Sequence, residues 1–297
     1  MSTQTTAWSI WEQLSEPIHG TVPDGKPAWK DNAYLAFWDP TSEVFGAAHV
    51  STSPNAEGRR ARFSISIQGR AVEIVEDLAP GTFESDSISF GLDDTIRVRS
   101  AELTGTLTNT PIFAVADYSR HSVIPPLPGC EPLQHFQRAA SVRGDFVLAD
   151  GERVTFEGHG FRDRTWGYRD ESSSISEYIA FMVVFSDHSL TAMRFHGTDG
   201  SDRTEGYLLH GEGEPQPITA IEVTRDASGL LHSARLAASS GDIELSARPR
   251  AGGFWVPMGW VRHGPTMSAY DEFRPVVTED GRKGFAMIEH GGIRNLF

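Results

Sequence analysis

The sequence lacks the features that mark several common classes of protein. Among its 297 residues Cys130 is the only cysteine, so neither an intramolecular disulfide nor a cysteine-based zinc site can form. No stretch approaches the roughly 18 consecutive apolar residues of a membrane span. The N-terminus, MSTQTTAWSIWEQ, has no basic n-region of a secretory signal. We therefore expect a cytoplasmic protein with no stable membrane insertion.

Positive charge and catalytic motifs are also scarce. Acidic residues outnumber basic ones by 40 to 26, and this net charge of −14 argues against binding to nucleic acid or anionic membranes. The sequence contains no nucleophile elbow, no zinc-protease histidine pair and no phosphate-binding loop, and its eleven histidines stand singly. Neither a metal nor a nucleotide cofactor is implied, and we expect no cofactor.

Helical periodicity is nearly absent, and short alternating segments take its place. The one predicted helix spans 7–14, where three apolar residues share a face before Pro17 ends it. Elsewhere apolar and polar residues alternate in short segments between glycine-containing turns, which is typical of a barrel or sandwich. The expected strands are 62–67 and 71–75 (a hairpin), 96–107, 144–148, 154–156, 178–185, 190–195, 218–224, 231–237 and 243–247.

The chain repeats a short pattern at an offset of about half its length. Residues 32–37 (NAYLAF) resemble residues 176–181 (SEYIAF), and in both places an aromatic strand is followed by a turn and a second strand. This repetition predicts an ancient duplication into two barrel halves. A proline-rich segment at 125–129 marks the junction. We expect an N-terminal segment at 1–26, a first half at 27–130 and a second half at 131–297.

The most informative segment is 158–170, GHGFRDRTWGYRD, which places three arginines, two acids, a histidine and a tryptophan between apolar strands. In an extended chain alternate residues share a face. One face would then carry Arg162, Arg164 and Trp166, and the other Asp163 and Thr165. Two interpretations stay open, because charges this dense must be paired when buried. The segment is either a salt-bridged barrel corner or the polar wall of a cavity.

This segment resembles the signature G-x-G-x-R-D-x-[ST]-W-G-x-R of a lipocalin-like superfamily. The superfamily includes hydroxyneurosporene synthase (a carotenoid hydratase) and AttH-like proteins, with kievitone hydratase, tocopherol cyclase and fungal pericyclases as distant relatives. LQHFQ at 133–137, WKD at 29–31 and FWDP at 37–40 also resemble family segments. The resemblance extends over roughly residues 27–297 and implies two calycin-like barrels in tandem.

The sequence departs from the family signature at one position. The family commonly has R-D-H-[ST]-W-G, and the resemblance implies that this histidine and the tryptophan serve catalysis in the hydratases. Here Arg164 stands at the histidine position, whereas Trp166 matches. Because arginine does not exchange a proton near neutral pH, a histidine-mediated acid–base step does not carry over.

The residue types nevertheless suggest a division of roles. Arg164 is suited to hold a carboxylate, enolate or other oxyanion, and the indole of Trp166 can stabilise a developing cation. A carboxyl group of Asp163 or Glu177 would transfer the proton, and Tyr178 would donate a hydrogen bond or position the substrate. Further candidates for substrate contact are His159, Arg194, His196 and Trp260.

Taken together, these features predict a cofactor-independent lyase or isomerase of the hydratase, dehydratase or cyclase type. Its substrate would be an apolar, unsaturated metabolite, such as a terpenoid, steroid or polyketide, bound in a barrel cavity. The alternative is a non-catalytic carrier of such hydrophobic molecules, which the missing histidine also fits. A third hypothesis is that the polar segment only joins the halves. Convergent polar groups would favour the enzyme, and a wholly apolar cavity the carrier.

Overall fold

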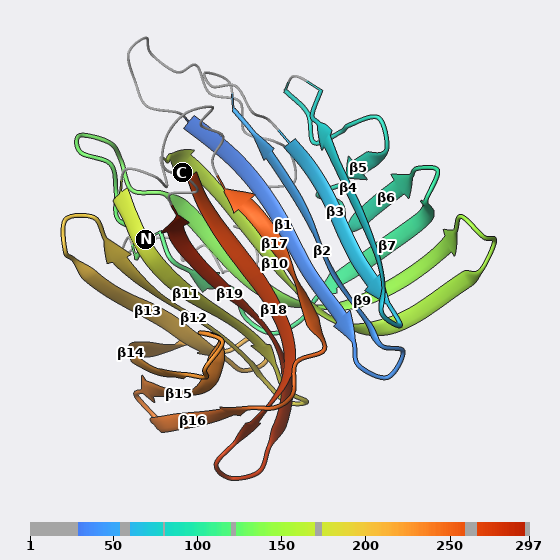
Figure 1. Ribbon diagram of the computed structural model, residues 1–297. Helices are drawn as coiled ribbons and strands as arrows, with labels where there is room; N and C mark the ends of the chain where they lie inside the picture. The colour runs from blue at the N-terminus through green and yellow to red at the C-terminus, as the bar shows by residue number, and fades with distance from the viewer. Residues whose placement is uncertain are drawn as a thin grey trace, which may run out of the picture. The chain divides into compact units, whose positions relative to one another are not determined.

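The regular structure of the described chain is built from β-strands. The computed structural model describes residues 29–53, 60–79, 81–119, 123–169, 174–258 and 266–294. These ranges contain nineteen strands and no helical element, which confirms the all-β prediction (Figure 1). Nothing in them has the length and hydropathy of a membrane-crossing helix. The helix predicted at 7–14 lies outside the described residues.

The first sheet is an open, antiparallel half-barrel within the described ranges. Its strands follow the order β4-β3-β2-β1-β10-β9-β7-β6-β5. Their bounds are β1 Trp29–Asp39, β2 Val44–Thr52, β3 Arg60–Ile67, β4 Arg70–Asp77, β5 Ile88–Phe90, β6 Thr95–Arg99, β7 Leu103–Pro111, β9 Gln134–Leu148 and β10 Arg153–Tyr168; a two-residue strand, β8, spans Ala116–Asp117. The long hairpin β9–β10 thus carries the polar signature into the centre of this sheet.

The second sheet closes into a barrel. Its order is β16-β15-β14-β13-β12-β11-β19-β18-β17. An additional pairing of β16 with β18 closes the eight strands from β16 to β18 into a ring. The bounds are β11 Ile175–Val184, β12 Ser189–Gly197, β13 Asp202–Leu209, β14 Gln216–Arg225, β15 Leu231–Ala238, β16 Gly241–Ala247, β17 Gly252–Met258, β18 Thr266–Thr278 and β19 Lys283–Arg294. Closure removes the exposed edges that an open sheet retains.

The two sheets share a pattern of strand connections. Each begins with an antiparallel meander, of four strands in the first sheet and six in the second, and each ends with a hairpin whose last strand returns to pair with the first: β10 beside β1, and β19 beside β11. The repeated sequence segments lie in the equivalent strands β1 and β11. This order agrees with two tandem barrel-type halves, as the sequence predicted.

Contacts group the residues into two units that are not continuous in sequence. One unit comprises 1–115 and 134–167, and the other 116–133 and 168–297. The signature hairpin therefore belongs by contacts to the first unit, although the sequence boundary at 130 assigned it to the second half. The boundary at 130 was drawn from the sequence repeat and not from contacts, so it stays a prediction.

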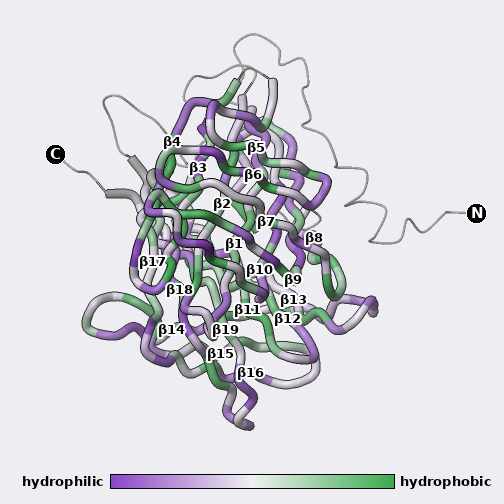
Figure 2. Tube along the Cα trace, turned by 90° about the vertical axis from the view of Figure 1, so that its right-hand side faces the viewer, coloured by the Kyte–Doolittle hydropathy of each residue, from purple (hydrophilic) through white to green (hydrophobic). Residues whose placement is uncertain are grey.

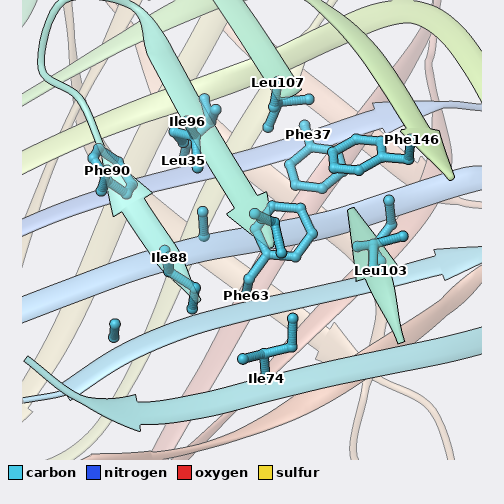
Figure 3. Packing of buried hydrophobic residues seen from close by; sticks show 14 of the residues in the cluster. Leu35, Phe37, Phe63, Ile74, Ile88, Phe90, Ile96, Leu103, Leu107 and Phe146 are labelled. Carbon is cyan, nitrogen blue, oxygen red and sulfur yellow. The ribbon is translucent and has the colours of Figure 1, made fainter. Parts of the chain in front are cut away.

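Apolar side chains that alternate along the strands form one core in each unit. In the first unit Phe63 lies 5.9 Å from Phe37 and 5.7 Å from Phe146 between ring centroids, and Figure 3 shows the three rings gathered in the core. In the second unit the core includes Phe181 and Ile288. The alternation is visible as repeated changes of hydropathy along the strands (Figure 2). Residues that share a strand face with these side chains point inward.

One predicted strand is in fact two. The alternation over 96–107 predicted a single strand, but β6 and β7 are separated by a turn at 100–102. The hydroxyl oxygen of Ser100 accepts hydrogen bonds from the backbone N–H groups of Glu102 (3.2 Å) and Leu103 (3.1 Å). A serine turn of this kind satisfies the backbone locally and reverses the chain without a glycine.

Candidate functional site

Two glycines of the signature bring β10 close to β1. A side chain on Gly158 or Gly160 would overlap the carbonyl oxygens of Trp38 and Ala36, respectively. Glycine is therefore required here for the close approach of the two backbones. This packing places the C-terminal half of β10 beside the N-terminal half of β1.

The side chains of β10 alternate as the sequence predicted. Phe156 belongs to the apolar core, and the even-numbered positions that follow on the same face include Arg162, Arg164 and Trp166. The odd-numbered Asp163 hydrogen-bonds instead to Gln137 and His135 on the opposite face of the hairpin. The polar signature is thus divided into two separate clusters.

Arg164 lies in the inward cluster and is almost completely buried. Its Nη1 forms an ion pair with Asp31 and donates a 2.8 Å hydrogen bond to the carbonyl oxygen of Asn32. The guanidinium carbon lies 5.4 Å from the ring centroid of Phe83 and 5.3 Å from that of Trp166. The cation is therefore held by one carboxylate and flanked by two aromatic side chains.

The other two nitrogens of Arg164 are unused. Among the described residues no hydrogen-bond partner lies near Nε or Nη2, although both atoms are buried. These nitrogens share one edge of the planar guanidinium, which we call the donor edge of Arg164. Burying donors without partners costs free energy, roughly 1–3 kcal/mol for one group and more near a charge. A ligand oxygen at the donor edge would recover that cost.

The neighbouring arginines on this face are engaged differently. Arg162 pairs with Asp94 at 2.5 Å, and burial lowers its pKa while Asp94 opposes the shift. Nε of Arg138 donates to the carbonyl oxygen of Phe113 at 2.8 Å. These contacts tie the sheet to its loops, so part of the signature serves a structural, salt-bridged role.

Asp163 is the centre of the outward cluster. Its carboxylate accepts hydrogen bonds from His135 and Gln137, both at 2.6 Å, and from Thr165 at 2.8 Å. Burial favours a higher pKa, but the charge of His135 and these three hydrogen bonds outweigh it and lower the pKa of Asp163 to about 2. The group is a carboxylate near neutral pH and has no proton to donate. His159, on the same face, is exposed, and partial desolvation lowers its pKa against the opposing charge of Asp39.

Glu177 lies in the second unit, within a chain of ion pairs. It accepts a 2.7 Å hydrogen bond from Nη2 of Arg225, whose Nη1 lies 3.1 Å from Nδ1 of His290. The other ring nitrogen of His290 lies 2.9 Å from Glu272, which also accepts a 2.6 Å hydrogen bond from Arg274.

Among the remaining predicted residues of the second unit, Arg194 and His196 share one partner, and Tyr178 has another. Tyr178 donates to the carboxylate of Glu289 and stacks on Phe195 at 4.9 Å between ring centroids. Arg194 is paired with Asp202 by two hydrogen bonds, of 3.0 and 2.7 Å. His196 lies 3.7 Å from the same carboxylate. Trp260 lies outside the described residues.

Of the eight predicted residues that the structure describes, four belong to the first unit and four to the second. Only Arg164 and Trp166 are brought together on an inward face. The sequence analysis did not identify Asp31 and Phe83, which complete their surroundings. The sequence does contain a signal for Asp31: it is a charged residue at a position that shares the apolar face of β1 with Leu35. No three metal-ligating side chains converge within the described ranges.

Crystal structures of three proteins resemble this chain over nearly its whole length. CghA with Sch210972 has a TM-score of 0.66 at 12% identity and covers 92% of this chain and 94% of its own. A Nitrosomonas europaea protein described as AttH has a TM-score of 0.62 at 15% identity, covering 93% and 100%. Kievitone hydratase from Nectria haematococca has a TM-score of 0.53 at 13% identity, covering 94% of both chains. These likenesses show a shared fold and confirm the resemblance to AttH-like lipocalin-type proteins.

Sequence comparison supplies the family. A search of curated proteins finds no match. A family model described as "Domain of unknown function (DUF7064)" matches residues 15–292. Since this match extends over most of the sequence, the chain belongs to the DUF7064 family.

Proposed function

We propose that this chain is a cofactor-independent enzyme of the hydratase, dehydratase or cyclase type that acts on an apolar, unsaturated metabolite. The substrate would lie against the inward face of β10, where Arg164 meets Phe83 and Trp166. The donor edge of Arg164 is the observation that carries this proposal, because buried, unused donors are a binding group for oxygen. Terpenoids, steroids and polyketides offer both the hydrocarbon surface and the oxygen.

Arg164 would act as a fixed hydrogen-bond donor and not as an acid, because a guanidinium keeps its protons near neutral pH. Donation to a substrate oxygen stabilises negative charge that develops there and withdraws electrons from a conjugated double bond. The indole of Trp166 would stabilise positive charge elsewhere in the substrate by roughly 1–2 kcal/mol when desolvated. Asp31, which is paired with Arg164, would be the carboxylate that accepts a proton.

Among the three reaction types, cyclisation has the strongest support. A hydratase or dehydratase must deliver a proton as well as remove one. Asp163, the carboxyl group of the first unit proposed for that task from sequence, does not share the face of Arg164 and has a pKa of about 2, so it has no proton to deliver near neutral pH. Cyclisation of an activated alkene requires mainly orientation and charge stabilisation, which Arg164 and the aromatic rings can supply.

The names of the structural neighbours support the same class of function. One neighbour is a hydratase, and another was crystallised with a small molecule, Sch210972. This support is by analogy of fold, and the residues around Arg164 are the independent argument.

The proposal is tested by incubating the protein in heavy water with a panel of terpenoids, steroids and aromatic polyketides, followed by native mass spectrometry and chromatography. We expect a retained compound to change in retention time, or to gain deuterium or the mass of water. Arg164→Gln should abolish this conversion. Arg153→Gln, which alters an exposed arginine of the same strand, should preserve it. Conversion at the wild-type rate by folded Arg164→Gln would show the proposal to be wrong.

The second candidate function is a carrier, and Arg164 at the histidine position of the family signature favours it. A carrier would retain a compound that emerges with its mass and its chromatographic retention unchanged. Arg164→Gln would weaken binding of the compound to a carrier, and neither the variant nor the wild type would convert it.

A further inference from the structure

A second polar group on the inward face of the first sheet also lacks a partner among the described residues. Asn109 lies on β7 and is 4% exposed. Its Nδ2 donates a 3.0 Å hydrogen bond to the carbonyl oxygen of Asp94, whereas its buried Oδ1 accepts none. Exchanging the two amide atoms would bring two acceptors together, so the carbonyl of Asp94 fixes the orientation of the amide. The unused atom of Asn109 is therefore an acceptor.

The alternation along β7 directs this acceptor inward. Leu103 and Leu107 share the face of Asn109 and belong to the apolar core, where Figure 3 shows both. Thr108, on the opposite face, is exposed. Oδ1 of Asn109 thus lies on the inward side of the sheet, as the donor edge of Arg164 does.

Asn109 and Arg164 lie towards the same end of this sheet. β7 and β10 are both antiparallel to β9, so they run in the same direction, and each residue lies in the C-terminal half of its strand. Asp94 connects the two regions: its carbonyl oxygen binds Asn109, and its carboxylate binds Arg162. Arg162 precedes Arg164 by two residues on the same face of β10. An elongated ligand on this face could therefore contact both Asn109 and Arg164.

We propose that Oδ1 of Asn109 is a second ligand-binding group, which accepts a hydrogen bond from a hydroxyl or N–H group of the molecule that Arg164 holds. This inference rests on the proposed function. It narrows the substrate to an apolar metabolite that carries a hydrogen-bond donor as well as an oxygen acceptor, as a hydroxyketone does. It would equally define the ligand of a carrier.

The two unused groups make opposite demands on a ligand. The donor edge of Arg164 offers only N–H groups, and Oδ1 of Asn109 offers only lone pairs. An ether or carbonyl oxygen can serve Arg164, but beside Asn109 it would leave two acceptors facing each other. A buried acceptor without a donor costs free energy, which a hydroxyl group recovers. Sites that hydrogen-bond a hydroxyl group reject analogues without it, because their own polar atom is then left unpaired.

The test compares three ligands that differ only at one end: 4-acetyl-4′-hydroxybiphenyl, its methyl ether and 4-acetylbiphenyl. The same three groups are compared on a 2-acetylnaphthalene frame, which gives a second spacing between the carbonyl and the hydroxyl. Dissociation constants for the full-length protein are measured at pH 7 by ligand-observed NMR. On at least one frame we expect the hydroxyl compound to bind roughly tenfold more tightly than the other two. No gain from the hydroxyl group on either frame, or no binding of any ligand, would overturn the inference.

A variant shows whether Asn109 is the source of this preference. Asn109→Leu removes the acceptor at nearly constant volume, and the tenfold preference for the hydroxyl compound should be lost. Thr108→Val is the matched control, because it alters an exposed neighbour on the same strand, and it should retain the preference. A folded Asn109→Leu protein that keeps the preference would overturn the inference, and Asn109 would then only hold the turn at Asp94. If Asn109→Leu fails to fold, the comparison of ligands on the wild type decides.

Arg164→Gln distinguishes this inference from the proposed function. The variant should weaken all three ligands of a frame by a similar factor and leave their order unchanged, because each carries the same acetyl group. Weaker binding to Arg164→Gln without a preference for the hydroxyl compound in the wild type would overturn the role of Asn109 alone. Equal binding of every ligand to Arg164→Gln and to the wild type would overturn the proposed site together with the inference.

Discussion

Both units bury a charged group next to an apolar core, but they satisfy it to different degrees. In the second unit both carboxylate oxygens of Glu272 have partners, Arg274 and His290. In the first unit one nitrogen of Arg164 is paired with Asp31 and two others are unused among the described residues. A fully satisfied polar network stabilises one conformation, whereas an incomplete one retains capacity for a ligand. The difference supports a structural role for the cluster around Glu272 and agrees with the binding role proposed for Arg164.

The position of each cluster agrees with this assignment. Glu272 shares a strand face with Val276, and His290 shares one with Ile288; both Val276 and Ile288 belong to the apolar cluster of the closed barrel. From His290 the polar contacts continue through Arg225 to Glu177. These charges are therefore part of a continuous network in a closed barrel, whereas the sheet around Arg164 remains open within the described ranges.

The largest expected effect comes from breaking the satisfied cluster. Glu272→Ala leaves Arg274 buried without its carboxylate, and we expect a loss of about 3–5 kcal/mol in the free energy of unfolding. Urea denaturation measures this loss. Glu244→Ala removes the partner of a surface ion pair with Arg235 and should cost less than about 1 kcal/mol. Equal effects of the two changes would contradict the structural role of Glu272.

The outward cluster of the first unit should have an intermediate effect that depends on pH. The pKa of Asp163 is about 2 in the folded protein and about 3.9 in an unfolded chain. Because the folded pKa is the lower one, ionised Asp163 stabilises the protein above about pH 4, and this contribution is lost as the pH falls towards 2. At pH 7 Asp163→Asn should cost about 2 kcal/mol.

Urea denaturation between pH 7 and pH 3 measures this contribution. The difference between wild type and Asp163→Asn should shrink steadily below pH 4. Asp145→Asn serves as the control, because its carboxylate is exposed and pairs with Arg153; it should change stability little at any pH. A difference for Asp163→Asn that is independent of pH would mean that the carboxylate is not what stabilises the hairpin.

A substitution beside Arg164 should change the free energy of unfolding less than the two substitutions above, but it should reduce activity. Trp166→Ala removes an aromatic ring beside Arg164 and should reduce turnover roughly tenfold while the sheet stays folded. Trp255→Ala is the matched control, because this tryptophan is 52% exposed. Circular dichroism checks folding, and the heavy-water assay measures turnover. Normal activity of Trp166→Ala would remove Trp166 from the site.

The sequence was sufficient where the physics is local. The period of two placed Arg164 and Trp166 on one face and Asp163 on the other, because alternation along a strand needs no tertiary information. Alternation also marked Asp31 as a charged residue on an apolar face, but it could not reveal its contact with Arg164. The two residues are 133 positions apart, and their contact depends on the pairing of β10 with β1. The sequence analysis also grouped Glu177 with Arg164 because they are close in sequence, although the chain passes into the other unit between them.

The smallest expected effect therefore decides which unit contains the working site. Glu177 is 53% exposed and pairs with Arg225, so Glu177→Gln should cost less than about 1 kcal/mol in stability. It should leave turnover unchanged, because its carboxylate is already paired with an arginine at the protein surface. The same denaturation and heavy-water measurements apply. A large loss of turnover in a stable Glu177→Gln protein would reverse the comparison: the ion pairs of the second barrel would be the reactive groups, and the unused donors of Arg164 would bind no substrate.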